Sequence, residues 1–234
     1  MTIEIPMSPE IFFTTRRPFT DHDDTMAASK EIVTEYYYAN VSAKKKRNPK
    51  DIQHYHKVRE WALEDGFNYE EATQIEFLLW MNPDVLYQAK PVPGACEVSC
   101  WFYEHKIGLP VLTSRMDYSQ IKPVAFRNMR DATVAWYEHW MPWVPADDVY
   151  LQGSPSLPSD IFKAWFIRMF KIGSYFEDSV VHAGTILTYT DAYVTLLSDN
   201  IVAQHINNPN LVRIQGVNGK LPDLRTVADY LYGR

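Results

Sequence analysis

The chain has 234 residues, a length that suits one large domain or a core with a smaller inserted unit. With 46% hydrophobic and 14% aromatic residues it belongs to the globular class, and no low-complexity tract indicates disorder. The formal net charge of -6 provides no overall field that would attract nucleic acid. A bound polyanion would therefore need a local basic patch.

Cysteine usage and the amino-terminal segment favour a soluble, cytoplasmic protein with no membrane partner. Cys96 and Cys100 lie one helical turn apart, and we expect both to be reduced, because two thiols cannot form a structural zinc site alone. The first residues carry Glu4 and Glu10 rather than a basic segment followed by an apolar one. No uncharged apolar run reaches the length that spans a bilayer.

The first predicted element is a β segment from Ile11 to Phe13, which residues 16 to 18 interrupt before Phe19 and Thr20 resume it. Asp21 and Asp23 follow directly, where this strand leads into a loop. Open α/β sheets bind ligands at the carboxyl ends of their strands. Two carboxylates this close indicate a hard metal ion, an acid/base couple, or both. The alternative is an acidic turn that caps the next helix.

Residues 28 to 90 show a helical pattern without a convincing strand. We expect a first helix capped by Ser29, a second from Asp51 to Glu64, and a third from Tyr69 to Trp80. The basic run Lys44-Lys45-Lys46-Arg47 should be an exposed connector, either solvated or in contact with a phosphate backbone. Most aromatic side chains of this segment should be core, although one or two could stack on a base: Tyr36, Tyr37, Tyr38, Trp61, Phe67, Tyr69 and Trp80.

After the helical segment, a helix over residues 96 to 105 and an apolar run over residues 109 to 112 lead to Thr113, Ser114 and Arg115. Hydroxyl and backbone donors at such a strand exit would hold a phosphate oxygen, while the alternative is an ordinary polar loop. An amphipathic helix from Val124 to Trp140 and a strand over residues 149 to 151 follow.

A further helix is predicted from Ile161 to Phe170, with Lys163 in its first turn. The helix dipole disfavours a cation there, so a neighbouring anion would explain it; a solvated lysine is the alternative. A short strand then ends in a second acidic pair, Glu177 and Asp178. A strand over residues 211 to 214 and a helix over residues 224 to 231 close the chain without a catalytic signal.

In this order the four candidate sites resemble the motifs of the haloacid dehalogenase (HAD) superfamily of phosphohydrolases. Asp21-His22-Asp23-Asp24-Thr25 matches the first motif, Asp-x-Asp-x-Thr, and residues 109 to 115 resemble the second. The third falls on Lys163, with Lys171 as a rival too close to the acidic pair, and the fourth on Glu177-Asp178 in place of the commoner Asp-Asp. The resemblance covers residues from about 11 to 190.

The resemblance implies an α/β fold: a HAD-like, Rossmann-type three-layer sandwich with a mostly parallel sheet. Residues 1–27 and 91–234 would form the phosphatase core, and residues 28–90 an inserted all-helical cap of the C1 type. Within the superfamily, the segments 113–115 and 176–179 are most similar to deoxyribonucleotidases and to the phosphatase domain of polynucleotide kinases.

The resemblance also implies a role for each candidate residue. Asp21 would be the nucleophile that forms an aspartyl-phosphate, and Asp23 the acid/base, with a pKa raised by the neighbouring Asp21 charge. Thr113, Ser114 and Lys163 would neutralise the phosphoryl oxygens. Mg²⁺ would be held by Asp21, the backbone carbonyl of Asp23, Asp178 and, directly or at one remove, Glu177. Arg115, Arg127 and Arg130 are candidates for substrate binding.

These roles predict a magnesium-dependent phosphomonoesterase that hydrolyses a nucleoside (deoxy)monophosphate, with the helical segment closing over the pocket. One alternative is a polynucleotide 3'-end phosphatase, for which residues 44 to 47, Arg127 and Arg130 would supply phosphate contacts. Another is a binding module that keeps the fold without turnover. The sequence does not indicate the oligomeric state.

Overall fold

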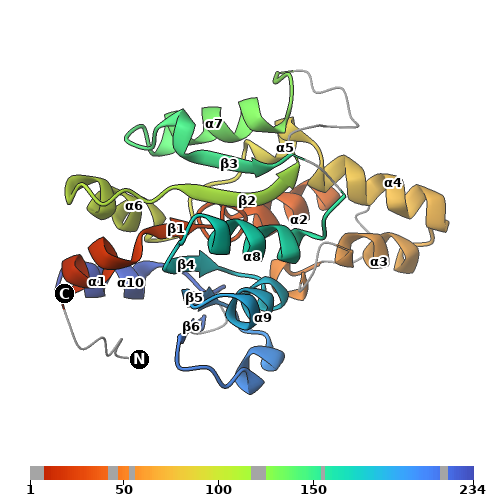
Figure 1. Cartoon of the computed structure of the whole chain (residues 1–234). Helices are drawn as coiled ribbons and strands as arrows, with labels where there is room; N and C mark the ends of the chain where they lie inside the picture. The colour runs from red at the N-terminus through yellow and green to blue at the C-terminus, as the bar shows by residue number, and fades with distance from the viewer. Residues whose placement is uncertain (1–7, 42–46, 53–55, 117–124, 154–155, 217–220) are drawn as a thin grey trace.

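A computed structural model describes residues 8–41, 47–52, 56–116, 125–153, 156–216 and 221–234. These residues form a six-stranded, fully parallel sheet with the strand order β3-β2-β1-β4-β5-β6, covered by helices (Figure 1). The strands are β1 Pro18–Thr20, β2 Val111–Met116, β3 Val149–Gln152, β4 Ser174–Glu177, β5 Tyr193–Leu197 and β6 Leu211–Ile214. The predicted α/β fold with a parallel sheet is confirmed.

The sheet separates two apolar layers, because successive strand residues point to opposite faces. Leu112, Tyr175 and Leu196 pack with α8 (Ser159–Met169) and α9 (Val180–Tyr189) on one face. Their neighbours in sequence, such as Val111 and Phe176, pack on the other face. The helices of that face are α1 Pro9–Arg16, α6 Ala95–Glu104, α7 Met129–Trp140 and α10 Arg225–Leu231. The three layers are the ones the resemblance implied.

Helix α1 replaces the β segment that was predicted from Ile11 to Phe13, and this prediction was wrong. The Ser8 side chain accepts a hydrogen bond from the Ile11 amide, and Pro9 takes the first helical position. Phe12 and Phe13 are buried on the inner side of this short helix, whereas Ile11 is exposed. The strand that leads into Asp21 is consequently only β1, three residues long.

The helical segment contains α2 Ser29–Asn40, the 3₁₀ helix η1 Pro49–Asp51, α3 Lys57–Glu64, α4 Tyr69–Trp80 and α5 Pro83–Leu86. Among the described residues, the second helix begins at Lys57 rather than Asp51. Ser29 is not the cap of α2: Ala28 precedes the helix, and the Ser29 hydroxyl binds Asp23. The division of the chain into a cap and a core remains a proposal. Lys44, Lys45 and Lys46 lie outside the described residues.

Aromatic side chains form the centre of this helical segment. Tyr37 and Trp61 are fully buried and meet edge to face, with ring centroids 5.6 Å apart. The Tyr37 hydroxyl donates to Asp65, which also pairs with Arg47. These two rings hold helices together and are therefore not available to stack on a base.

Three boundaries differ from the prediction in the part of the chain that carries the site. Strand β2 continues to Met116, so Thr113 and Ser114 lie inside it rather than beyond its end. Helix α8 begins at Ser159, which moves Lys163 from the first turn to the second. Helix α7 begins at Met129 after an Asn128 cap, and Val124 lies outside the described residues. The remaining elements are η2 Ala146–Asp148 and η3 Ile201–His205.

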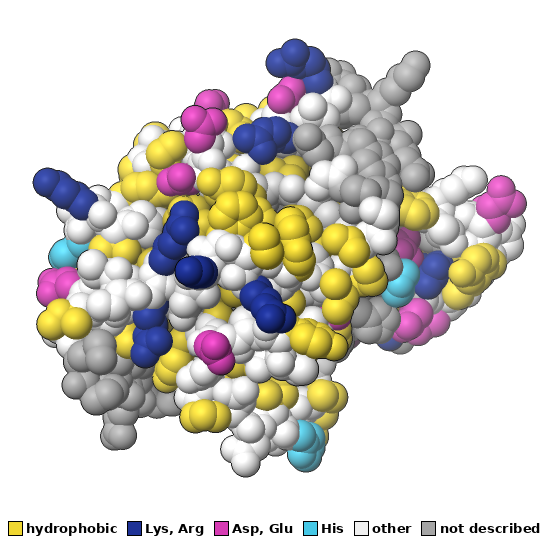
Figure 2. Space-filling view, in the orientation of Figure 1, with side chains coloured by type: hydrophobic (Ala, Val, Ile, Leu, Met, Phe, Trp, Pro, Cys, Tyr) yellow, Lys and Arg dark blue, Asp and Glu magenta, His cyan; other side chains and the backbone are white. Residues whose placement is uncertain are grey.

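Helix α8 lies on the side of the sheet that faces the viewer in Figure 1, and Figure 2 shows hydrophobic side chains gathered over the middle of that side. Its outer surface exposes Ile161, Trp165 and Met169, which are four residues apart. Its inner surface buries Ala164, Ile167 and one charged residue, Lys163. The ionic partners of Lys163 must therefore come from the protein interior.

None of the described helices is both long enough and apolar enough to cross a bilayer.

Gly94 offers a test of how the helical segment rejoins the sheet. Its φ of +87° is left-handed, and an added Cβ would lie 2.5 Å from the Arg225 amide nitrogen. We expect Gly94→Ala to lower the free energy of unfolding by about 2 to 4 kcal/mol. Gly184→Ala, inside α9 with no atom within 4 Å of its Cβ, should raise it by up to about 1 kcal/mol. Urea unfolding of both variants measures the contrast, and equal stabilities would contradict it.

Candidate active site

The central group of the site joins Asp21, Lys163 and Glu177. Asp21 follows β1 and its amide donates to the carbonyl of Phe176, 2.8 Å away, which fixes it beside the end of β4. Glu177 is the last residue of β4, and Lys163 reaches them from α8. The Lys163 Nζ lies 2.8 Å from Asp21 Oδ2 and 2.8 Å from Glu177 Oε2. Three residues that the sequence predicted to converge are therefore in direct contact.

The buried Lys163 ammonium forms ion pairs with two carboxylates at once. Burial acts to lower the pKa of Lys163, but Asp21 and Glu177 together raise it above its ordinary value. Burial acts to raise the pKa of Glu177, but Lys163 brings it well below its ordinary value. The pKa of Asp21 is raised, chiefly by burial and against the effect of Lys163. A second positive charge beside Asp21 would oppose this rise and favour its ionised form.

His182 completes the surroundings of Lys163 and was missed by the sequence analysis. Its Nδ1 lies 3.2 Å from Lys163 Nζ, and its Nε2 lies 2.9 Å from Ser159 Oγ. An ammonium has three N–H groups, and Asp21, Glu177 and His182 are placed to accept them. One of these contacts must be exchanged before Lys163 can bind a phosphoryl oxygen.

Asp23 is held by Arg115, which the sequence analysis assigned to substrate binding. Arg115 Nε lies 2.9 Å from Asp23 Oδ2 and Nη2 lies 2.6 Å from Oδ1, while Ser29 donates to the same Oδ1. Burial would raise the pKa of Asp23, but Arg115 and Ser29 hold it well below its ordinary range. The prediction of a raised pKa was therefore wrong, because the dominant neighbour is a guanidinium and not the Asp21 carboxylate.

Asp178 and Asp24 share a second lysine, Lys30, which the sequence analysis also missed. Lys30 Nζ lies 2.7 Å from Asp178 Oδ2 and 3.6 Å from Asp24 Oδ2. Lys30 is the second residue of α2, where the helix dipole disfavours a cation. The argument that singled out Lys163 would have singled out Lys30 as well.

The remaining predicted residues divide between the site and other parts of the molecule. Thr113 is buried, and its Oγ1 accepts from the Arg115 amide. Since Thr20 pairs with Val111, Thr113 and Ser114 extend past the last pair of β1, level with the Asp21 loop. Arg127 pairs with Asp131, its side chain 92% exposed, and Arg130 binds the Val149 carbonyl. These two arginines have other partners, and the structure does not pair them with the carboxylates of the site.

The carboxylate oxygens of the site differ in whether the protein already engages them, which decides which could bind a divalent cation. Both Glu177 oxygens are used: Oε2 by Lys163, and Oε1 by the amides of Asp178 and Ser179. Asp21 Oδ1 is buried and has no hydrogen-bond partner among the described residues. A buried carboxylate oxygen without a partner is costly unless a cation binds it. Ligand atoms of Asp21, Glu177 and His182 lie within 4.8 Å of one another, but Lys163 already contacts all three residues.

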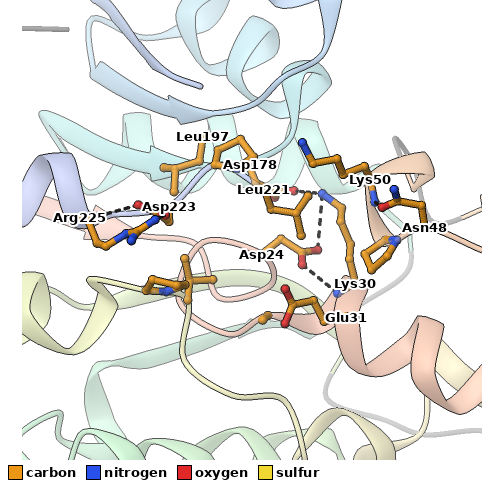
Figure 3. A pocket seen from close by; sticks show the side chains of 15 residues that line it. Asp24, Lys30, Glu31, Asn48, Lys50, Asp178, Leu197, Leu221, Asp223 and Arg225 are labelled. Carbon is orange, nitrogen blue, oxygen red and sulfur yellow. Dashed lines mark hydrogen bonds and ion pairs between the residues drawn. The ribbon is translucent and has the colours of Figure 1, made fainter. Parts of the chain in front are cut away.

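A pocket of about 440 Å³ adjoins the site (Figure 3). Asp24, Lys30 and Asp178 form part of its wall, and Asn48 and Lys50 of the helical segment face them. Asp21 is not part of the lining. No aromatic residue belongs to the lining among the described parts of the chain. The pocket is therefore a polar and aliphatic space beside the acidic residues.

No family model matches the chain, and no curated protein matches it. Solved structures do match it, and two of them reach a TM-score of 0.50 or more over most of both chains. A putative phosphoglycolate phosphatase from Lactobacillus delbrueckii subsp. bulgaricus has 12% identity and a TM-score of 0.54 over 93% of this chain and 98% of that one. A HAD hydrolase, family IA, variant 3, from Entamoeba histolytica has 12% identity and a TM-score of 0.50 over 92% and 98%.

The chain has the fold of the HAD hydrolases. At this level of identity the likeness establishes the HAD fold and not an activity. In the HAD fold of this chain, the four predicted motif positions lie directly after β1, within β2, on α8 and at the carboxyl end of β4. The activity of the site therefore has to be inferred from the chemistry of these residues.

Asp24 provides a test of the electrostatics of this site. Burial raises its pKa from 3.8 to about 7, so its protonated form adds stability that is complete below pH 3.8 and lost as the pH rises through 7. Asn keeps a neutral side chain at every pH and tolerates the φ of 55° at this position. Asp24→Asn should match the wild type at about pH 4 and be more stable at about pH 8. Urea unfolding in the presence of a chelator measures this, and a constant difference would contradict it.

Proposed function

We propose that the chain is a magnesium-dependent phosphomonoesterase that works through an aspartyl-phosphate on Asp21. The observation that carries the proposal is the geometry of Asp21, with Oδ2 2.8 Å from the buried Lys163 ammonium and Oδ1 without a partner among the described residues. An ionised carboxylate needs no base to act as a nucleophile. The HAD fold of the chain agrees with this chemistry by analogy.

Magnesium fits this donor set, because it prefers hard oxygen ligands and uses few carboxylates. Asp21 Oδ1 and Asp178 would hold it together with the backbone carbonyl of Asp23. Glu177 would not bind the ion directly, because its two oxygens already accept hydrogen bonds from Lys163 and from two amides. The cation would partly neutralise the negative charge of Asp21 and of the phosphoryl oxygens.

The other site residues would act on the phosphoryl group and on protons. Thr113 and the Ser114 amide would bind phosphoryl oxygens, and Lys163 would join them by exchanging one of its three contacts. Asp23, held ionised by Arg115, can take the proton of the water that hydrolyses the aspartyl-phosphate. Protonation of the leaving oxygen requires the Arg115 pair to open. Leaving groups that need little protonation are therefore favoured.

A nucleoside (deoxy)monophosphate is the substrate class that we propose to test first. The support is the aromatic content of the helical segment, although Tyr37 and Trp61 belong to its core and the described pocket lining has no aromatic ring. A polynucleotide end receives less support, because Arg127 and Arg130 have other partners. A module without turnover would keep the fold but not the activity.

Replacing the nucleophile tests the proposed reaction. Asp21→Asn should reduce hydrolysis of a generic phosphomonoester at least about a thousandfold while the protein stays folded, because an amide cannot form the phosphoenzyme. Asp131→Asn, which removes the carboxylate partner of Arg127 on α7, is the matched control and should retain activity. Initial rates with magnesium measure this. Retained turnover in Asp21→Asn would remove Asp21 as the nucleophile.

A substrate comparison tests the proposed class. With magnesium, nucleoside monophosphates should be hydrolysed with a higher kcat/KM than 3'-phosphorylated oligonucleotides, and added salt should change the rate little, since few backbone phosphates are contacted. Small sugar phosphates belong in the same panel. A preference for sugar phosphates would refute the nucleotide and leave the phosphomonoesterase in place, whereas a rate that falls steeply with salt would favour the polymer.

A further inference from the structure

Lys30 ties the helical segment to the acidic end of β4. It is the second residue of α2, and its backbone amide donates to Asp24 Oδ1 at 2.8 Å. Its ammonium lies 2.7 Å from Asp178 Oδ2 and its side chain is only 18% exposed (Figure 3). Burial acts to lower the pKa of Lys30, but Asp178 and Asp24 raise it above its ordinary value. Lys30 is therefore a permanent cation held against a carboxylate of the site.

The same carboxylate is a ligand in the proposed magnesium site, and this inference rests on that proposal. A magnesium ion lies about 2.1 Å from a ligand oxygen, and Lys30 Nζ lies 2.7 Å from Asp178 Oδ2. Two cations on one carboxylate at these distances repel each other strongly in a poorly solvated site. We propose that Lys30 and the divalent cation compete for Asp178, so that Lys30 lowers the affinity of the site for magnesium.

Lys30 has a position to move to when the cation takes Asp178. Asp24 Oδ2 is 3.6 Å from Nζ, so a small displacement strengthens this second ion pair as the first one opens. The side chain also lines the pocket of about 440 Å³, which gives it room. Binding of the cation would thus move the positive charge of Lys30 from Asp178 towards Asp24 within the same pocket wall.

A calorimetric titration of magnesium into the whole protein tests the competition without measuring turnover. Lys30→Met keeps an unbranched side chain and removes the charge, and should bind magnesium at least about tenfold more tightly than the wild type. Lys50→Met is the matched control, because Lys50 is a lysine of the same pocket lining whose ammonium lies 3.5 Å from Asp199. Its affinity should stay within about twofold of the wild type.

Chemical labelling gives a second measurement on the unaltered protein. Reductive methylation of lysines, read by mass spectrometry, should modify Lys30 several times faster when magnesium is added, while the rate at Lys50 stays the same. This measurement decides the question if Lys30→Met does not fold, since that variant leaves two carboxylates without their cation.

The outcomes separate this inference from the proposed function. If the wild type binds no magnesium, the proposed metal site fails, and the competition with it. If the wild type binds magnesium but Lys30→Met binds it no more tightly than Lys50→Met, the metal site stands and the competition is overturned. Labelling of Lys30 that is unchanged or slower with magnesium overturns it as well.

Discussion

The Lys163 ammonium, fully buried between Asp21 and Glu177, determines how the rest of the site is arranged. A buried charge is tolerated only when ion pairs and hydrogen bonds replace the water it has lost, and removing one partner of such a pair is strongly destabilising. Lys163 meets this requirement with three contacts, which join α8 to the ends of β1 and β4 and to His182 on α9. The position of the proposed nucleophile is thus a consequence of the packing of the sheet.

The balance of charge around this pair explains why a divalent cation suits the site. Five carboxylates are close together in the described structure, and three basic side chains pair with them: Asp21, Asp23, Asp24, Glu177 and Asp178 with Lys163, Arg115 and Lys30. If all are ionised, the negative charges exceed the positive ones by two. Burial raises the pKa values of Asp21, Asp24 and Asp178, and the neighbouring carboxylates add to the rise. A magnesium ion would remove the excess without protonation.

The sequence was sufficient for the features that depend on local pattern and order along the chain. Apolar runs followed by polar residues predicted β2, β4 and β6, and the parallel sheet then required their carboxyl ends to meet. The run from Ile11 to Phe13 was mistaken for a strand because three apolar residues carry no period, and the Ser8-Pro9 cap was overlooked. The partners of Arg115, Lys30 and His182 are tertiary contacts, and no spacing in the sequence specifies them.

The ion pairs Lys30–Asp178 and Arg115–Asp23 are more exposed than the central pair of Lys163 and Glu177. Lys163 and Glu177 have no exposed side-chain surface, whereas the side chains of Asp178 and Asp23 are 14% and 26% exposed. Opening a pair with a partly exposed carboxylate costs less than opening one in the core, because water and incoming ligands replace the lost contacts. Lys30 and Arg115 can therefore release their carboxylates during a reaction, while Glu177 keeps Lys163 in place. The buried Lys163–Glu177 pair can thus hold Asp21 fixed while Asp178 and Asp23 exchange Lys30 and Arg115 for other partners.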